Sequence, residues 1–173
     1  MVDKANKQEP GAIPAAPGGL AVRVGPAGVA PDDPMGIHIR LEVTGGHADE
    51  RYEFSFVADG SGEVTTSLLD RVRKVEKGAR TGKLPRQDVA RILKSIDVGR
   101  LAGAARAAQP IPPGSAVGRL TISDGSEEVS VVFMADRGQA ETAGFRLDPA
   151  LEETVEQIYR LAARQLGVKA VRP

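Results

Sequence analysis

The sequence predicts an α+β fold in which an antiparallel sheet of about five strands carries two helices on one face. Two stretches, residues 37–43 and 52–56, alternate apolar and polar side chains, which is the period of a strand with one buried face. Other stretches space their apolar residues by three and four, as an amphipathic helix does. The predicted strands come in groups of three and then two, separated by a helix, which is an order typical of antiparallel pairing.

The first hairpin, residues 37–57, organises the predicted core. Its first strand has an aliphatic residue at every odd position. Gly45 and Gly46 lie in the segment that reverses the chain, because glycine reaches positive φ angles at no steric cost. Half of the six aromatic residues of the chain fall on one face of the returning strand, and we expect these rings to nucleate the core: Tyr52, Phe54 and Phe56. The opposite sheet face should be wet, and it carries Arg40, Glu42, Glu53 and Ser55.

A turn at residues 59–62 leads to a third predicted strand, residues 63–69, which completes a meander. Residues 71–86 are predicted to be either a continuation of that strand along a sheet edge or a long exposed loop. Leu84-Pro85 then opens a helix, since proline is tolerated in a first helical turn. The helix ends near Gly99, and its apolar stripe consists of Val89, Ile92, Leu93 and Ile96.

A second hairpin is predicted from residues 117–123 and 127–135, which alternate on either side of an Asp-Gly turn. Residues 136–147 contain two glycines and few core residues, so we expect an exposed loop there, anchored by Phe145. Asp148 and Pro149 have the residue types of an N-cap and a first helical position. The last helix ends at Gly167, and its buried stripe consists of Leu151, Val155, Ile158, Leu161 and Ala162.

Composition divides the chain into a disordered Pro/Gly/Ala-rich tail at 1–35, a single α+β domain at 36–167 and a short C-terminal tail at 168–173. The first segment holds six of the twelve prolines and almost no large apolar side chains, so burial cannot offset its ordering entropy. A sharper alternative is that Leu20, Val22 and Val24 form a short docking segment. No signal peptide or membrane span is recognisable, and we expect a soluble, cytoplasmic protein.

Charge and composition limit the possible functions. The 23 basic and 23 acidic residues cancel, so no overall field would attract a polyanion or a charged membrane. The absence of cysteine excludes disulfides, thiolate nucleophiles and Cys-type metal sites. There are only two histidines, no Gly-x-Ser-x-Gly elbow and no phosphate-binding loop. We therefore expect a protein that is not an enzyme and needs no cofactor or metal.

The turn after the first strand is the first candidate site, as a protein-binding loop made of Gly45, Gly46, His47, Asp49 and Arg51. His47 with the carboxylates of Asp49 and Glu50 has the chemistry of a metal site. One nitrogen ligand in an unfixed loop favours the simpler interpretation, a turn.

The basic segment is the second candidate, because clustered cations release counterions from phosphate. Its candidate nucleic-acid-binding residues are Arg71, Arg73, Lys74, Lys77, Arg80 and Lys83. The neutral net charge and the aromatic residues committed to the core argue against nucleic acid. Lysine and arginine on a sheet edge also protect it from strand-to-strand aggregation, which is a purely structural explanation.

The run from Ile37 through Gly45-Gly46, followed by an aromatic strand, a glycine-containing turn and a Leu-Pro helix start, resembles the small bacterial domains of the emfourin type. The similar region covers residues 37–167. The resemblance implies a folded protein inhibitor of thermolysin-type metalloproteases, and hence a non-enzymatic, protein-binding role. It implies an aromatic residue after the glycine pair, where this chain has His47.

Two hypotheses follow. The first is a protein-binding module, as a protease inhibitor or a regulatory or accessory subunit, acting through residues 44–51, residues 136–145 or the N-terminal tail. The second is a nucleic-acid-associated protein that uses residues 71–86. An enzyme is conceivable only if a partner's residues complete a site.

Overall fold

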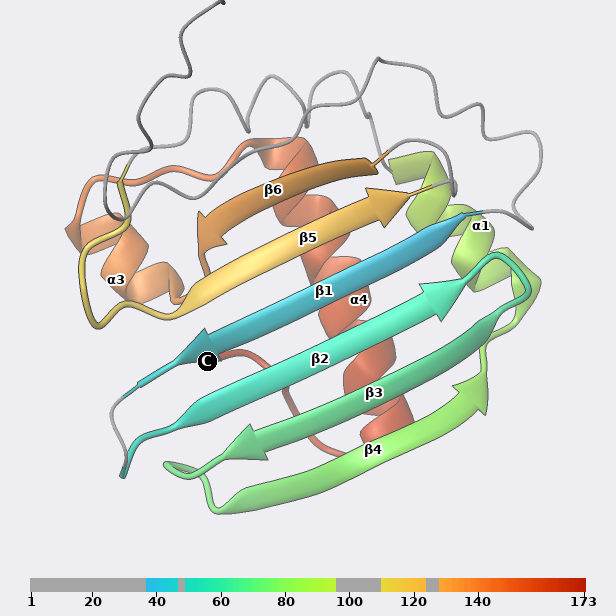
Figure 1. Cartoon of the computed structure of the whole chain (residues 1–173), viewed down its shortest axis with the longest axis horizontal. Helices are drawn as coiled ribbons and strands as arrows, with labels where there is room; N and C mark the ends of the chain where they lie inside the picture. Colours follow the sequence, from blue (N-terminus) through green and yellow to red (C-terminus); the bar gives the residue numbers. More distant parts are fainter. Residues whose placement is uncertain (1–36, 47–48, 96–109, 124–127) are drawn as a thin grey trace, which may run out of the picture.

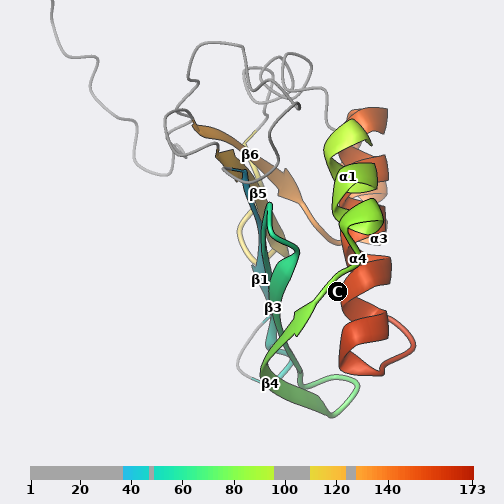
Figure 2. The ribbon, with the colours of Figure 1, turned by 90° about the vertical axis from the view of Figure 1, so that its right-hand side faces the viewer.

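The computed structural model describes residues 37–46, 49–95, 110–123 and 128–173. Six strands form one antiparallel sheet in the order β4-β3-β2-β1-β5-β6. The helices of the described residues all lie on one face of this sheet, so that the fold has two layers (Figures 1 and 2). The prediction of an α+β fold with an antiparallel sheet is confirmed, with one strand and one short helix more than expected.

The strands are β1 (His38–Gly45), β2 (Tyr52–Asp59), β3 (Glu63–Asp70), β4 (Val75–Lys83), β5 (Val117–Ser123) and β6 (Glu128–Met134). The helices are α1 (Arg86–Ser95), α3 (Arg137–Thr142) and α4 (Pro149–Leu166). Each strand is antiparallel to its neighbours in the sheet.

The first hairpin is the centre of the core, as predicted. In β1 the odd-numbered side chains are buried and the even-numbered ones exposed, and in β2 the three aromatic rings are buried. Leu41 lies opposite Phe56 on one side and Leu120 on the other, so β1 pairs with both β2 and β5. This arrangement places the apolar residues of three strands on the face that the helices cover.

Residues 71–83 correct the first expectation for the basic segment, because they neither continue β3 nor form a long loop. They reverse the chain in a turn that includes Lys74 at φ 55° and then form β4, which pairs with β3 at one edge of the sheet. The register shifts between Thr66 and Leu68, so the pairing contains an irregularity. No side chain of β4 is fully buried, and its sequence therefore lacks the apolar alternation of β1 and β2.

Residues 136–147 also differ from the expected loop, because they include α3. Asp136 is its N-cap, and its Oδ1 accepts a hydrogen bond of 3.0 Å from the backbone N–H of Gln139. Only Ala140 of this helix is buried, so a helix of six residues has no apolar stripe that a sequence pattern could reveal. Phe145 follows it and is half-buried.

Helix α4 begins and ends where the sequence predicts. Asp148 Oδ1 accepts from the Ala150 N–H at 2.8 Å, and Gly167 closes the helix in the left-handed conformation at φ 66°. All five residues of the predicted stripe are buried, and they are joined by Thr154, Tyr159 and Leu166. In α1 the predicted Val89 and Ile92 are buried, whereas Ile96 and Gly99 lie outside the described residues.

The residues after α4 return to the sheet on the helical side. Val171 is 1% exposed, Arg172 forms an ion pair with Glu156 of α4, and its carbonyl oxygen accepts a hydrogen bond from Arg73. The N-terminal segment at 1–35 lies outside the described residues. None of the described helices combines the length and the apolar character needed to cross a membrane.

The other sheet face carries no helix in the described part of the chain (Figure 2). Arg40 and Glu42 are exposed there, as expected for a wet face. Ser55 and Ser67 are half-buried, and their hydroxyl oxygens lie 2.8 Å apart in one hydrogen bond.

Candidate functional site

The predicted Gly45-Gly46 turn lies at the end of the sheet where β1 ends and β2 begins. Gly46 has φ 80°, and a Cβ there would collide with the backbone carbonyl of Glu50. A Cβ on Gly45 would lie 2.6 Å from Ala116 Cα, because the chain before β5 passes against it. Glycine is therefore required at both positions, by close backbone approach at the first and by conformation as well at the second.

The other predicted residues of this turn surround the glycine pair. His47 lies outside the described residues. Asp49 and Arg51 are exposed, and Arg51 Nε donates to Glu53 Oε1 at 2.7 Å. The Arg51 carbonyl also accepts the Arg71 N–H at 3.0 Å, so the turn touches the start of the basic segment.

Two hollows meet at Gly45 and Gly46. The first has a volume of about 380 Å³, and its polar lining includes Glu50, Tyr52, Asp70 and Arg73. The second, about 460 Å³, opens beside Arg51 and Ser115. The glycine turn and Arg73, which the sequence predicts as parts of two separate candidate sites, line one hollow in the structure.

A buried acidic residue, Asp70, lines the first hollow. Asp70 is 4% exposed, and its carboxylate accepts from the Arg73 backbone N–H at 3.0 Å and from Arg73 Nη1 at 2.8 Å. Tyr52 lies directly opposite Asp70 in the sheet, and its hydroxyl has no hydrogen-bond partner among the described residues. Burial raises the pKa of Tyr52 far above its ordinary value, with Tyr159 and Asp70 adding to the shift, so its hydroxyl stays protonated and can donate a hydrogen bond.

The remaining basic residues do not form one surface. Arg71 and Lys74 are exposed in the turn before β4. Lys77 and Arg80 are paired with the helix-side residues Leu68 and Thr66 of β3, and directly opposed residues share a face. Lys83 is paired with Glu63, whose side chain belongs to the opposite face. The six candidate cations are thus divided between a turn and both faces of an edge strand.

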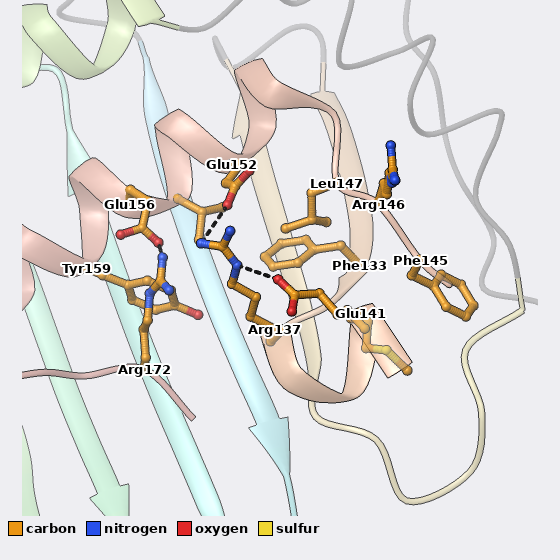
Figure 3. A pocket seen from close by; sticks show the side chains of 14 residues that line it. Phe133, Arg137, Glu141, Phe145, Arg146, Leu147, Glu152, Glu156, Tyr159 and Arg172 are labelled. Carbon is orange, nitrogen blue, oxygen red and sulfur yellow. Dashed lines mark hydrogen bonds and ion pairs between the residues drawn. The ribbon is translucent and has the colours of Figure 1, made fainter. Parts of the chain in front are cut away.

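A third hollow, of about 390 Å³, lies between α3, α4 and the end of β6 (Figure 3). The sequence patterns did not predict it. Its apolar lining includes Phe133, Leu147 and Val155. Tyr159 also lines it; this residue is 5% exposed, packs on Phe54 at 5.4 Å between ring centroids, and has an unpartnered hydroxyl in the described structure. Burial raises the pKa of Tyr159 well above its ordinary value.

Ion pairs cross the rim of this pocket. Arg137 Nε donates to Glu141 at 2.9 Å within α3, and Arg137 Nη1 lies 3.4 Å from Glu152 of α4. The hydrogen bond that Arg137 donates to Glu141, helped by the charge of Glu152, raises the pKa of Arg137 above its ordinary value. Arg172 pairs with Glu156 beside Tyr159, as Figure 3 shows.

Two sequence signals for this pocket were present. Arg137 and Glu141 have the four-residue spacing of an ion pair on a helix. Tyr159 is four residues after Val155 and three before Ala162, so it belongs to the buried stripe of α4. What the sequence could not show is that these two helices converge at β6.

None of the described residues that line these three hollows is a histidine or a cysteine. The phenols of Tyr52 and Tyr159 are held protonated, which makes them donors rather than bases. Within the described ranges, no three His, Asp or Glu side chains gather as metal ligands would.

Comparison with protein-family models gave no match. No curated protein matched the sequence either.

Proposed function

We propose that this protein is a non-catalytic binding module that contacts a partner protein at the end of the sheet around Gly45 and Gly46. The observation that carries the proposal is the pair of hollows that meet at these glycines. Exposed polar residues, Asp49, Glu50 and Arg51, lie beside them on the loop that follows β1. Loops held by a rigid sheet commonly carry binding residues.

The rigidity of this loop's two ends supports the proposal. Gly45 lies against the backbone of Ala116, and Arg51 is held by its contacts with Glu53 and Arg71. A partner would therefore meet a surface that loses little entropy on binding. The resemblance to emfourin-type domains makes a thermolysin-type metalloprotease the first partner to test, with inhibition as the finer proposal.

A photo-cross-linking residue in place of Arg51 tests the contact surface. We expect a discrete cross-linked product with one partner protein in native lysate, and no such product from the same residue in place of Arg160, an exposed position on α4. Identical products from both positions, or none from position 51, would contradict the proposed surface.

Inhibition is tested separately. The full chain is added to a thermolysin-type metalloprotease, and peptide hydrolysis is followed with the Arg51→Glu variant and the Arg160→Glu control. We expect Arg51→Glu to weaken inhibition about tenfold or more, since a reversed charge in an interface costs over 1 kcal/mol. An absence of inhibition removes the protease as partner but leaves the cross-linking result unchanged.

The exposed cations of the turn before β4 favour nucleic-acid association as a second candidate function. If the protein binds nucleic acid through these cations, its affinity for DNA or RNA should fall steeply as the salt concentration rises, because each phosphate contact releases counterions. Titration of labelled single-stranded and double-stranded DNA and RNA at low and physiological salt checks it. A weak, salt-independent signal would eliminate it.

A further inference from the structure

We propose that the pocket between α3 and α4 binds a small carboxylic acid with an apolar body. None of the residues that line this pocket also lines the hollows at Gly45 and Gly46, so the two proposals use different side chains. It depends on the apolar lining, on the unpartnered Tyr159 hydroxyl and on the guanidinium groups at the rim.

The shape and lining suit an apolar body of modest size. Phe133 and Leu147 lie together on one side of the pocket (Figure 3), and Val155 of α4 is a further apolar lining residue. The volume of about 390 Å³ is in the range of small-molecule sites. Such pockets combine apolar walls with a few polar groups that orient the ligand.

The Tyr159 hydroxyl, which has no partner in the described structure, can donate a hydrogen bond to a ligand. The carboxylates at the rim are already paired with arginines: Glu141 and Glu152 with Arg137, and Glu156 with Arg172. Tyr159 is 5% exposed and its hydroxyl has no acceptor within the described structure. A buried donor left unpaired is costly, so a ligand that brings an oxygen acceptor is favoured.

The arginine at the rim of the pocket favours a ligand whose hydrogen-bond acceptor is negatively charged. Arg137 uses its Nε and Nη1 groups, and a guanidinium has five N–H bonds, so donors on Nη2 remain for a ligand oxygen. A carboxylate suits a guanidinium better than a neutral carbonyl does, because both partners are charged. The side chain of Arg137 is 65% exposed, so an incoming acid can reach its guanidinium group.

The experiment is an NMR titration of the full chain with three probes: phenylacetate, 4-methylpentanoate and the neutral phenylacetamide. We expect saturable shifts at the backbone amides of α3 and of the first half of α4 with both acids, and weaker binding of the amide. An absence of saturable shifts with both acids, or equal affinity for phenylacetate and phenylacetamide, would overturn the proposal.

Two variants and one matched control locate the ligand. Tyr159→Phe keeps the ring and removes the hydroxyl, and it should weaken phenylacetate binding about fivefold, the worth of one hydrogen bond. Tyr52→Phe is the matched control, since this second buried tyrosine lines the neighbouring hollow and not this pocket. Arg137→Gln should weaken the acids and leave the amide unchanged. Equal affinities for the Tyr159→Phe variant and the unaltered chain would remove the site.

Discussion

At the scale of single residues, Gly46 shows how local backbone geometry limits the sequence. Its φ of 80° is unfavourable for any residue with a side chain, and a Cβ would also strike the Glu50 carbonyl. Gly144 has a similar φ of 75°, but a Cβ there meets nothing within 4 Å. Replacing Gly144 would therefore cost only the unfavourable backbone conformation, whereas replacing Gly46 would also cost the collision with Glu50.

We expect Gly46→Ala to lower the free energy of unfolding by about 3 kcal/mol and Gly144→Ala by about 1 kcal/mol. Urea denaturation of both variants measures the difference. Equal losses would show that the loop at Glu50 moves aside without cost.

Tyr52 and Tyr159 are the other residues whose environment has a measurable effect. Both phenols are buried without a partner in the described structure, and burial raises the pKa of each far above 10.0. The unfolded chain ionises first as pH rises, so it binds fewer protons than the folded chain above that value. The contribution of these two tyrosines to stability is therefore constant below about pH 10 and falls above it, by up to about 1.4 kcal/mol per pH unit for each tyrosine.

The double variant Tyr52→Phe/Tyr159→Phe should lose most of this alkaline decline. It should also be about 1 kcal/mol more stable at neutral pH, because each change removes an unsatisfied hydroxyl. Urea denaturation between neutral pH and about pH 11 checks both effects. A decline as steep as that of the unaltered chain would mean that other groups cause it.

At the scale of elements, Gln165 fastens α4 to the edge of the sheet. Its side-chain N–H groups donate to the carbonyls of Val64 at 3.1 Å and Arg80 at 3.3 Å, and its Oε1 accepts from the hydroxyl of Thr66, which is fully buried. One amide thus links a helix to β3 and β4. Without it, the Thr66 hydroxyl would lose this acceptor in the core.

We expect Gln165→Leu to lower the free energy of unfolding by about 2 kcal/mol, and Thr66→Val in the same chain to restore part of it. Gln87→Leu, at an exposed position of α1, should change stability by less than about 0.5 kcal/mol. Thermal and urea unfolding provide the comparison. Additive losses in the double variant would show that the two side chains do not interact.

Elements with a buried face were predictable from the sequence, and the two that bury little were not. β1, β2 and α4 alternate or repeat apolar residues because one face of each packs in the core. β4 and α3 bury almost nothing, so their residues carry no such pattern. The Gly45-Gly46 turn was also predictable from the sequence, because the need for glycine at a turn comes from the local backbone conformation.

The pockets were not predictable, since each is built from segments far apart in the chain. Arg73 reaches the glycine turn because β3 ends opposite the start of β2. Tyr159 and Arg137 line one pocket because α3 and α4 converge at β6. The residue types could suggest that these side chains bind a ligand or partner, but only the order of the strands in the sheet places them in the same pocket.

At the scale of the whole molecule, the sheet has two free edges in the described structure, β4 and β6. β4 carries Lys77, Arg80 and Lys83, the residue types that keep edge strands from pairing with other chains. This edge protection accounts for much of the basic segment. It also makes a prediction about assembly.

A variant with threonine at positions 77, 80 and 83 should associate as its concentration rises, because the edge would lose its charges and gain strand propensity. Light scattering after size-exclusion chromatography measures this. The control removes the same number of charges from Arg40, Arg119 and Arg160, which are exposed elsewhere. Association of the control alone, or of both variants equally, would show that net charge and not the edge is responsible.

The position of β1 between β2 and β5 has a consequence for how the chain reaches this structure. The first four strands pair with their neighbours in sequence, whereas Leu41 pairs with Leu120, which lies almost half of the chain away. Contacts between distant residues close large loops and form late. During synthesis, a nascent meander would therefore expose the β5-facing side of β1 until the second hairpin leaves the ribosome, and that interval is when this protein is most open to a chaperone.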